Sequence, residues 1–238
     1  MGTLPVVGVV DYGAGNLVSI DQALTRVGAE VRLVHHRDDL DGLTALVVPG
    51  VGAAGSAMRR LGRARLVDPI VDWIDAGRPY LGICLGLQLL FDASEEDGTT
   101  TLGVISGPTV RLEDAPTLPH IGWNQVVRRR DHPLFDGIAA DADFYFVHSY
   151  AGLPTGPAAA EMVVANTVHG RPFASAVARE AMFGVQFHPE RSGSDGLRLL
   201  ANFVKLAVAI NAKPGSRPAG PPAGATHAAV AGAVRRAS

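Results

Sequence analysis

Apolar residues in the first third of the chain alternate between short continuous runs and stripes with helical spacing. The runs predict strands, the first of them buried, whereas apolar residues three or four positions apart predict helices, each followed by a glycine. The predicted strands are residues 5–11, 30–34, 45–49 and 79–84, and the helical stripes are residues 17–27 and 67–74. This alternation predicts an α/β fold of three layers, with a doubly wound, mostly parallel sheet covered on both faces.

The pattern changes after about residue 100, where strand-like runs follow one another closely between Gly and Pro turns. These runs are residues 103–111, 125–130, 143–147, 162–165, 173–177 and 183–187. They predict antiparallel additions to the first sheet or further strands of it. A last helix is predicted over residues 194–210 from its apolar stripe. We therefore expect one domain over residues 1–212.

The C-terminal segment, residues 213–238, differs in composition from the rest of the chain. Pro, Gly and Ala supply 16 of its 26 residues, and it has no apolar periodicity. It holds four basic residues and no acidic one, which leaves the preceding domain mildly acidic. Such a segment can bury little apolar surface, so we expect a disordered basic tail.

Charge and cysteine content narrow the function classes. The formal net charge of the 238 residues is −2, which predicts binding neither to nucleic acid nor to an anionic membrane. The N-terminus has no basic region and only a short apolar run, so we expect no signal peptide and no membrane span. The single cysteine, Cys84, suits a cytoplasmic protein. No Cys/His cluster has metal-ligand spacing, so we expect neither a metal nor a cofactor.

The strongest local signal for chemistry is Gly82-Ile83-Cys84-Leu85-Gly86, which follows a predicted strand and opens an apolar helix predicted over residues 87–91. This is the pattern of a nucleophile elbow with cysteine in place of serine. A thiol at the amino end of a helix is favoured as the nucleophilic thiolate. The alternative is a buried, inert cysteine, which the two flanking glycines disfavour.

A nucleophile needs a base, and the base needs an orienting group. His188 ends an apolar strand in Val185-Gln186-Phe187-His188-Pro189-Glu190. Residues i and i+2 of an extended chain point to the same side, so Glu190 can lie beside the His188 ring and fix its tautomer. The alternative is a solvent-exposed strand end that carries both residues incidentally.

An oxyanion hole is the third requirement of this chemistry. The backbone N–H of Leu85, the residue after the nucleophile, is one candidate donor. Another can come from Val51 or Gly52 in Pro49-Gly50-Val51-Gly52, whose glycines let the backbone approach a ligand or rearrange. An ordinary turn between a strand and a helix explains this segment equally well.

A nucleotide site is the main alternative at the end of the first strand, where Asp11-Tyr12-Gly13-Ala14-Gly15-Asn16 hints at a dinucleotide loop. The third glycine of that motif is replaced by Val18, and no acidic residue ends the second strand near Val34. We therefore expect a turn or a partner contact here.

With these residues in hand, the chain resembles the class I, triad-type glutamine amidotransferases. Cys84 in Gly-Ile-Cys-Leu-Gly and His188-Pro189-Glu190 match the nucleophile and the His-x-Glu pair of that family. More closely, the chain resembles the glutaminase subunits of imidazole glycerol phosphate synthase, of histidine biosynthesis. The segments that carry this closer resemblance are residues 10–17, 49–52, 120–124 and 146–150. The resemblance covers about residues 5–211 and implies a flavodoxin-like fold.

The resemblance implies roles for individual residues. Cys84 would form a glutamyl thioester, His188 would protonate the departing ammonia and then activate water, and Glu190 would orient His188. The substrate glutamine would be held by a second set of residues, namely Gln88, Glu96, Ser149 and Tyr150. Residues 49–52 would contribute to the oxyanion hole and reorient before catalysis. Arg191 follows Glu190 where the family commonly has lysine, which keeps the charge but changes the geometry of an interface contact.

The implied partner is a cyclase subunit with a (βα)₈ barrel, bound as a heterodimer. It would use the ammonia to make imidazole glycerol phosphate and an aminoimidazole carboxamide ribotide. Residues 122–124 and 147–150 argue against one rival, a glutaminase that serves another synthase. The intact Cys84, His188 and Glu190 argue against a catalytically silent regulatory subunit. A thiol hydrolase that acts on peptides or esters is the third rival, and it would need no partner.

Overall fold

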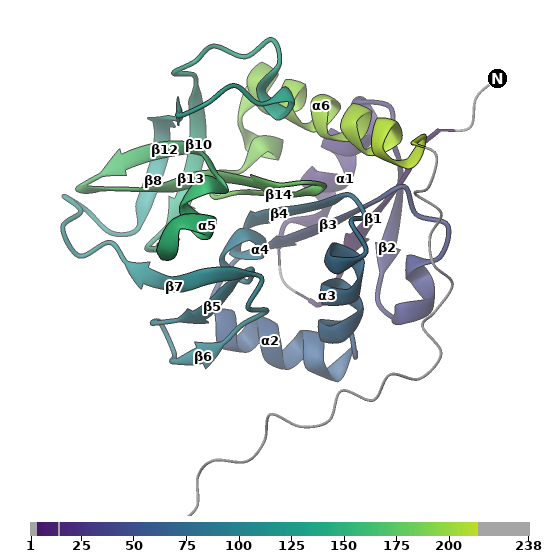
Figure 1. Ribbon diagram of the computed structural model, residues 1–238, viewed down its shortest axis with the longest axis horizontal. Coiled ribbons are helices and arrows are strands. Elements are labelled where there is room, and N and C mark those ends of the chain that lie inside the picture. Colours follow the sequence, from purple (N-terminus) through teal and green to yellow (C-terminus); the bar gives the residue numbers. More distant parts are fainter. Residues whose placement is uncertain (1–3, 14, 214–238) are drawn as a thin grey trace, which may run out of the picture.

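An eight-stranded sheet lies at the centre of the computed structural model, which describes residues 4–13 and 15–213 (Figure 1). The strands of this sheet are β1 Val6–Val10, β2 Glu30–Val34, β3 Ala45–Gly50, β4 Tyr80–Cys84, β9 Val127–Arg128, β12 Val163–His169, β13 Arg171–Arg179 and β14 Met182–Val185. Their order is β2-β1-β3-β4-β14-β13-β12-β9. The first five strands in this order run parallel to one another. Each of the last three, β13, β12 and β9, pairs antiparallel with the strand before it. The parallel part has the flavodoxin-like order, so the predicted fold class is confirmed.

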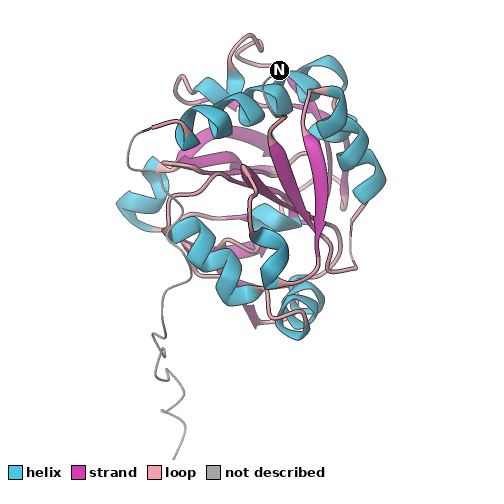
Figure 2. Ribbon diagram, turned by 90° about the vertical axis from the view of Figure 1, so that its right-hand side faces the viewer, coloured by secondary structure: helices cyan, strands magenta, loops and turns pink. Residues whose placement is uncertain are grey.

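Helices cover both faces of this sheet, as Figures 1 and 2 show. The helices are α1 Leu17–Arg26, α2 Ala54–Arg63, α3 Val67–Asp75, α4 Leu85–Gln88, α5 Gly156–Glu161 and α6 Gly193–Asn211, with 3-10 turns η1 Arg37–Leu40, η2 Pro133–Phe135 and η3 Pro189–Arg191. The helices α1 and α6 lie on one face, and α2 and α3 lie on the other. None of the helices within the described ranges is long and apolar enough to cross a bilayer.

Alternation along the strands builds a core on each face. In β3, Val47 packs into the cluster that contains Leu24 and Phe203, and Val48 packs into the cluster that contains Ile70. A strand buried on both faces has no polar side, which is why its sequence is a continuous apolar run. Complete burial of each such side chain stabilises the fold by about 1.5–3 kcal/mol relative to exposure.

Two smaller sheets extend the domain beyond its parallel core. One pairs β8 His120–Gln125 with β10 Asp143–His148, and the other has the order β11 Tyr150–Gly152, β7 Ile105–Arg111, β5 Phe91–Ser94 and β6 Thr99–Thr100. The expectation of antiparallel additions to the first sheet is therefore confirmed for β9, β12 and β13. The runs at residues 103–111 and 143–147 belong to the separate sheets.

One local expectation was wrong, and one helix was not predicted. The helix expected over residues 87–91 is absent: α4 ends at Gln88 after one turn, and Phe91 begins β5. Leu87, Leu89 and Leu90 are all fully buried, so their apolar run carries no periodicity that separates helix from strand. Helix α2 has no counterpart among the predicted elements, because alanines and Leu61 form most of its buried stripe. The expected disordered tail lies, apart from Lys213, outside the described residues.

Candidate active site

Cys84 is the last residue of β4 and lies in a strained backbone conformation, with φ of 52° and ψ of −107°. A non-glycine residue with positive φ is uncommon and costs about 1–3 kcal/mol, so it persists only where the surroundings enforce it. Helix α4 begins at the next residue, Leu85. The strand, the sharp turn and the helix start together make a nucleophile elbow. The side chain is almost buried, with 4% of Cys84 exposed.

The flanking glycines are required by close backbone contacts. A Cβ atom on Gly86 would lie 1.8 Å from the carbonyl oxygen of Val48, and one on Gly82 would lie 2.5 Å from that of Gly86. Real Cβ atoms do not approach backbone oxygens this closely. The spacing Gly-x-Cys-x-Gly is therefore a steric condition for placing the thiol at this position.

His188 and Glu190 form a buried pair just beyond β14. The His188 Nδ1 atom lies 2.8 Å from Glu190 Oε1, and the two side chains are 6% and 2% exposed. A carboxylate can only accept, so Nδ1 carries the proton of this bond. The other ring nitrogen, Nε2, is buried and has no hydrogen-bond partner among the described residues. The pair therefore leaves Nε2 as the nitrogen that can exchange a proton.

The protonation of His188 depends on the charge of Cys84. Burial by itself lowers the pKa of His188, but the negative thiolate of Cys84 and then the Glu190 carboxylate outweigh burial and raise this pKa to about 10. An imidazolium beside a thiolate is the charged pair that a cysteine nucleophile uses. The site can thus hold a thiolate and a proton donor together.

The segment proposed for the oxyanion hole runs beside the nucleophile. Gly50 ends β3 and is paired in register with Cys84 of β4. The Tyr12 hydroxyl donates a 2.9 Å hydrogen bond to the carbonyl of Pro49. Beyond it, Val51 is 47% exposed and Gly52 has a positive φ of 90°. The N–H of Leu85, as the first residue of α4, has no acceptor within that helix.

The residues expected to bind the substrate are not all in contact with one another. Gln88 is buried and donates to the Tyr150 carbonyl at 2.7 Å and to Gln186 Oε1 at 3.1 Å. Ser149 is half-buried in the strand connection before Tyr150. Glu96 is exposed in the turn between β5 and β6, and no contact joins it to the other site residues. Partial burial and then the neighbouring Asp97 raise the pKa of Glu96.

Gln186 contacts the nucleophile and was missed by the sequence argument. Its Nε2 atom donates to Cys84 Sγ at 3.6 Å, and the residue is fully buried. The available signal was its position two residues before His188, which places both side chains on one side of the extended chain. Gln186 directly follows β14, and a buried polar side chain needs partners, which here are the Cys84 sulfur and the Gln88 amide.

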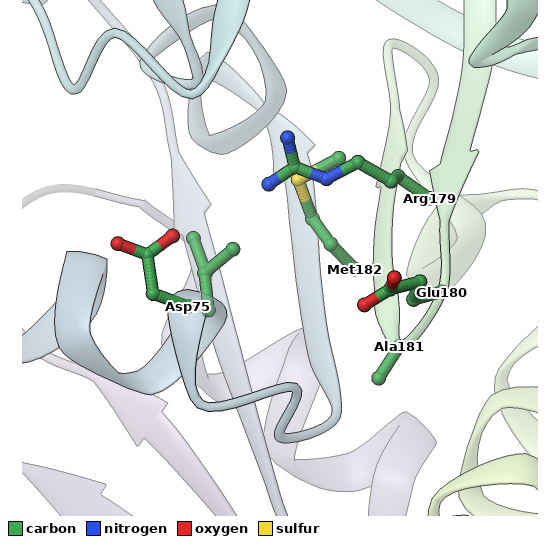
Figure 3. Close-up of a pocket in the computed structure, with 6 residues that line it drawn as sticks. Asp75, Arg179, Glu180, Ala181 and Met182 are labelled. Atoms are coloured by element: carbon green, nitrogen blue, oxygen red, sulfur yellow. The ribbon is translucent and has the colours of Figure 1, made fainter.

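Two cavities lie at opposite ends of the parallel strands. The smaller, of about 50 Å³, is beside His188 and Glu190 and is also lined by Asn16, Gly50 and Val51. Its place at the carboxyl ends of β1 and β3 is where ligands bind in sheets of this order. The larger, of about 330 Å³, lies at the turn between β13 and β14 near Asp75, remote from Cys84 (Figure 3). No group of three or more potential metal ligands gathers in the part of the chain that the structure describes.

Known proteins resemble the chain in sequence and in fold. The family model for class-I glutamine amidotransferases matches residues 8–207. The protein named imidazole glycerol phosphate synthase subunit HisH from Methanocaldococcus jannaschii is 42% identical over 202 residues, covering 84% of this chain and all of that protein. The protein of the same name from Gloeobacter violaceus is 44% identical over 216 residues, covering 89% and 94%.

Solved structures support the fold alone, because their sequence identities are low. A structure titled PurLQS from Thermotoga maritima has a TM-score of 0.68 at 20% identity and covers 86% of this chain and 99% of that one. One titled glutamine amidotransferase has a TM-score of 0.66 at 23% identity, with coverage of 85% and 98%. With the family match over most of its length, this chain belongs to the class-I glutamine amidotransferases.

Proposed function

We propose that this chain is the glutaminase subunit of an imidazole glycerol phosphate synthase. It hydrolyses glutamine to glutamate and ammonia, and it passes the ammonia to a cyclase subunit in histidine biosynthesis. The observation that carries this proposal is the Cys84 elbow, whose thiol interacts with His188 of the His188–Glu190 pair, in a chain whose full-length relatives are named as subunits of that synthase. Its single thiol suits a cytoplasmic setting.

The chemistry proceeds through a thioester. The Cys84 thiolate attacks the amide carbon of glutamine, and the carbonyl oxygen becomes an oxyanion. His188 gives a proton from Nε2 to the departing nitrogen, so the C–N bond breaks and ammonia leaves. Neutral His188 then takes a proton from water, which attacks the thioester and releases glutamate and the thiolate. Glu190 holds Nδ1 and stabilises the imidazolium throughout.

The oxyanion is stabilised by backbone donors. We assign one to the N–H of Leu85 and another to Val51 or Gly52, in the segment that lies beside Cys84. Loss of one such donor typically lowers the rate by about 10²–10³. A segment that can point either an N–H or a carbonyl at the oxyanion can therefore switch the enzyme on or off. The positive φ of Gly52 and the exposure of Val51 favour this role.

The substrate is held by residues at the end of α4 and around the start of β11. We assign this to Gln88, whose amide is fixed to the Tyr150 carbonyl, and to the backbone of Ser149 and Tyr150. Glu96 would bind the amino group of the substrate. Because Glu96 lies in an exposed turn and contacts none of the others, this assignment needs that turn to approach the bound glutamine.

The partner is a cyclase subunit with a (βα)₈ barrel, bound as a heterodimer. An apolar surface next to the site suits such a contact: Ile121 and Trp123 of β8 are 60% and 58% exposed. The Arg191 guanidinium lies 4.2 Å from the centre of the Tyr145 ring, directly after Glu190 in sequence. Aromatic and arginine side chains are enriched at protein interfaces. The ammonia would thus leave toward a surface that the partner covers.

Ammonia release from glutamine tests this function. It is measured for the lone chain, for the chain with the cyclase subunit, and for that complex with the cyclase's nucleotide ligand bound. We expect a low rate for the lone chain and a much higher rate in the ligand-bound complex. Equal rates in all three would remove the switch, and no ammonia in any of them would remove the glutaminase assignment.

A further inference from the structure

A continuous chain of hydrogen bonds runs from the surface of β8 to the sulfur of Cys84. The Asn124 amide contacts His120 Nε2 at 3.1 Å, and His120 Nδ1 lies 3.1 Å from His148 Nε2. His148 Nδ1 lies 2.9 Å from the Tyr150 carbonyl oxygen. The chain continues through Gln88 to Gln186, whose amide reaches Cys84 Sγ. Its members come from separate parts of the sequence and meet only in the fold.

The chemistry of each group fixes the direction of the chain. A backbone carbonyl only accepts, so His148 Nδ1 carries the hydrogen, and its Nε2 accepts when the ring is neutral. His120 must then donate from Nδ1 and accept at Nε2, where the Asn124 amide donates. The orientation of the Asn124 amide is itself fixed, because its Oδ1 accepts a hydrogen bond from the Gln125 N–H at 2.8 Å. From Asn124 to His148, every hydrogen-bond donor in the series points toward Tyr150.

The Tyr150 carbonyl oxygen accepts from both sides, because Gln88 also donates to it, and beyond Gln88 the donors point toward Cys84. Gln88 uses its amide nitrogen for Tyr150 and for Gln186 Oε1, so rotating the Gln88 amide would set two oxygens against each other. Gln186 Oε1 is thereby the acceptor, and Gln186 Nε2 is left as the donor to the sulfur. The Gln186 amide is fully buried, where a donor without an acceptor is costly.

We propose that Gln186 is a further catalytic residue that stabilises the Cys84 thiolate, and that His120, His148 and Gln88 are positioning residues that hold its amide toward the sulfur. An N–H that points at a sulfur stabilises negative charge there and is worth more in a buried site than in water. This inference rests on the proposed glutaminase chemistry of Cys84, because that chemistry needs the thiolate.

The histidines suit a fixed role because they stay neutral. Burial lowers the pKa of His120 to about 4 and that of His148 to about 3. Their surroundings also favour this: His120 stacks on His169 at 4.0 Å and on Phe146 at 4.9 Å. A neutral pair keeps one donor and one acceptor on each ring, which a charged ring would not. The relay, meaning the hydrogen-bonded series of Asn124, His120, His148, Tyr150 and Gln88, therefore transmits orientation and does not itself exchange protons with the substrate.

Alkylation of Cys84 by iodoacetamide across pH tests the proposal in the full-length chain without glutamine. Because Cys84 is the only cysteine, the rate reports one thiol, and its pH midpoint reports thiolate formation. Gln186→Met removes the amide while keeping the length of the side chain. We expect its midpoint to rise by about one pH unit, since a bond to a charged group contributes that order of stabilisation. Gln186→Asn, whose amide is too short, should shift the midpoint in the same direction if Gln186→Met fails to fold.

The relay is tested by remote variants with a matched control. His148→Phe fills the same aromatic surroundings without a donor and should raise the midpoint, whereas His148→Asn retains a donor near the Nδ1 position and should return it toward wild type. Thr167→Val is the control: it removes a buried hydroxyl bond, 2.9 Å to the Gln125 carbonyl, in the same region but outside the relay. The control should leave the midpoint unchanged.

The outcomes separate the two claims. An unchanged midpoint in Gln186→Met and Gln186→Asn would overturn the role of Gln186. A shift in those variants with none in His148→Phe, or an equal shift in Thr167→Val, would overturn the relay. The assay needs no turnover, so it stays decisive if the wild-type chain fails to hydrolyse glutamine, a result that would count against the proposed function instead.

Discussion

The Tyr12 hydroxyl holds the carbonyl of Pro49 with a 2.9 Å hydrogen bond, and this contact ties the end of the first strand to the segment proposed for the oxyanion hole. Tyr12 is 6% exposed, and burial, followed by the charge of Cys84, raises its pKa. The hydroxyl therefore stays protonated and remains a donor at every pH where the enzyme works. Its carbonyl partner belongs to the peptide bond just before Gly50, so the bond restricts how residues 49–52 can rotate.

Tyr12→Phe should loosen this segment and raise the glutaminase rate of the lone chain. A neutral hydrogen bond contributes about 1 kcal/mol, which corresponds to a change of about fivefold in a conformational equilibrium. We expect the lone chain to gain up to that factor, while the rate of the ligand-bound complex changes less. Steady-state rates of both forms measure it. A fall in both rates by the same factor would mean that Tyr12 supports the site without restraining a switch.

Gly86→Ala should destabilise the protein strongly. Its methyl group would lie 1.8 Å from the Val48 carbonyl oxygen, and relieving such overpacking costs about 1–3 kcal/mol or more. Gly62→Ala in α2 is a matched control, because its methyl group meets no atom within 4 Å and helix propensity favours alanine by about 0.5–1 kcal/mol. Urea denaturation of both variants measures the change. Equal stabilities would show that the elbow can open to accept a side chain.

The nucleophile and its pair could be predicted from sequence because they lie in short local patterns. The two glycines around Cys84 and the spacing of His188 and Glu190 each carry their own geometric reason. Gln186 could not be predicted in the same way, since its partner Cys84 is 102 positions away. The relay from His120 to His148 depends likewise on the register of β8 with β10. No local pattern fixes that register.

The lack of a local pattern also explains the errors in the predicted helices and strands. Leucines that are buried on all sides give no period, so the chain after Gln88 could not be divided into a one-turn helix and a strand. Helix α2 was missed because small residues cover its inner face. By contrast, β1, β3 and β4 could be predicted because burial makes their sequences nearly continuous apolar runs.

Acid should destabilise the protein partly through the buried histidines. The pKa values of His120 and His148, lowered by burial to about 4 and about 3, lie below the usual 6.5 of an unfolded chain. Between these values the unfolded chain binds more protons, so their contribution to stability is fully present above about pH 6.5 and is lost as the pH falls toward 4. His120→Gln should flatten the slope of unfolding free energy against pH in this window.

Chemical denaturation at several pH values measures this slope. Thr167→Val serves again as the control, because it removes a buried bond but no titrating group, and its slope should match that of wild type. The absolute stability of His120→Gln is not the test, since the loss of its hydrogen bonds lowers that at any pH. Parallel slopes for wild type and His120→Gln between pH 4 and 6.5 would contradict the assignment of His120 as a buried neutral ring.

The most direct measurement is the turnover of the Cys84→Ala complex, with its cyclase subunit, supplied in turn with glutamine and with ammonium. The variant lacks the only thiol of the chain, so thioester formation is impossible, whereas the cyclase reaction needs only ammonia. We predict no product from glutamine and near-normal product from ammonium at a pH where free ammonia is present. Product formed from glutamine at the wild-type rate would contradict the account, because the nitrogen would then be released without Cys84.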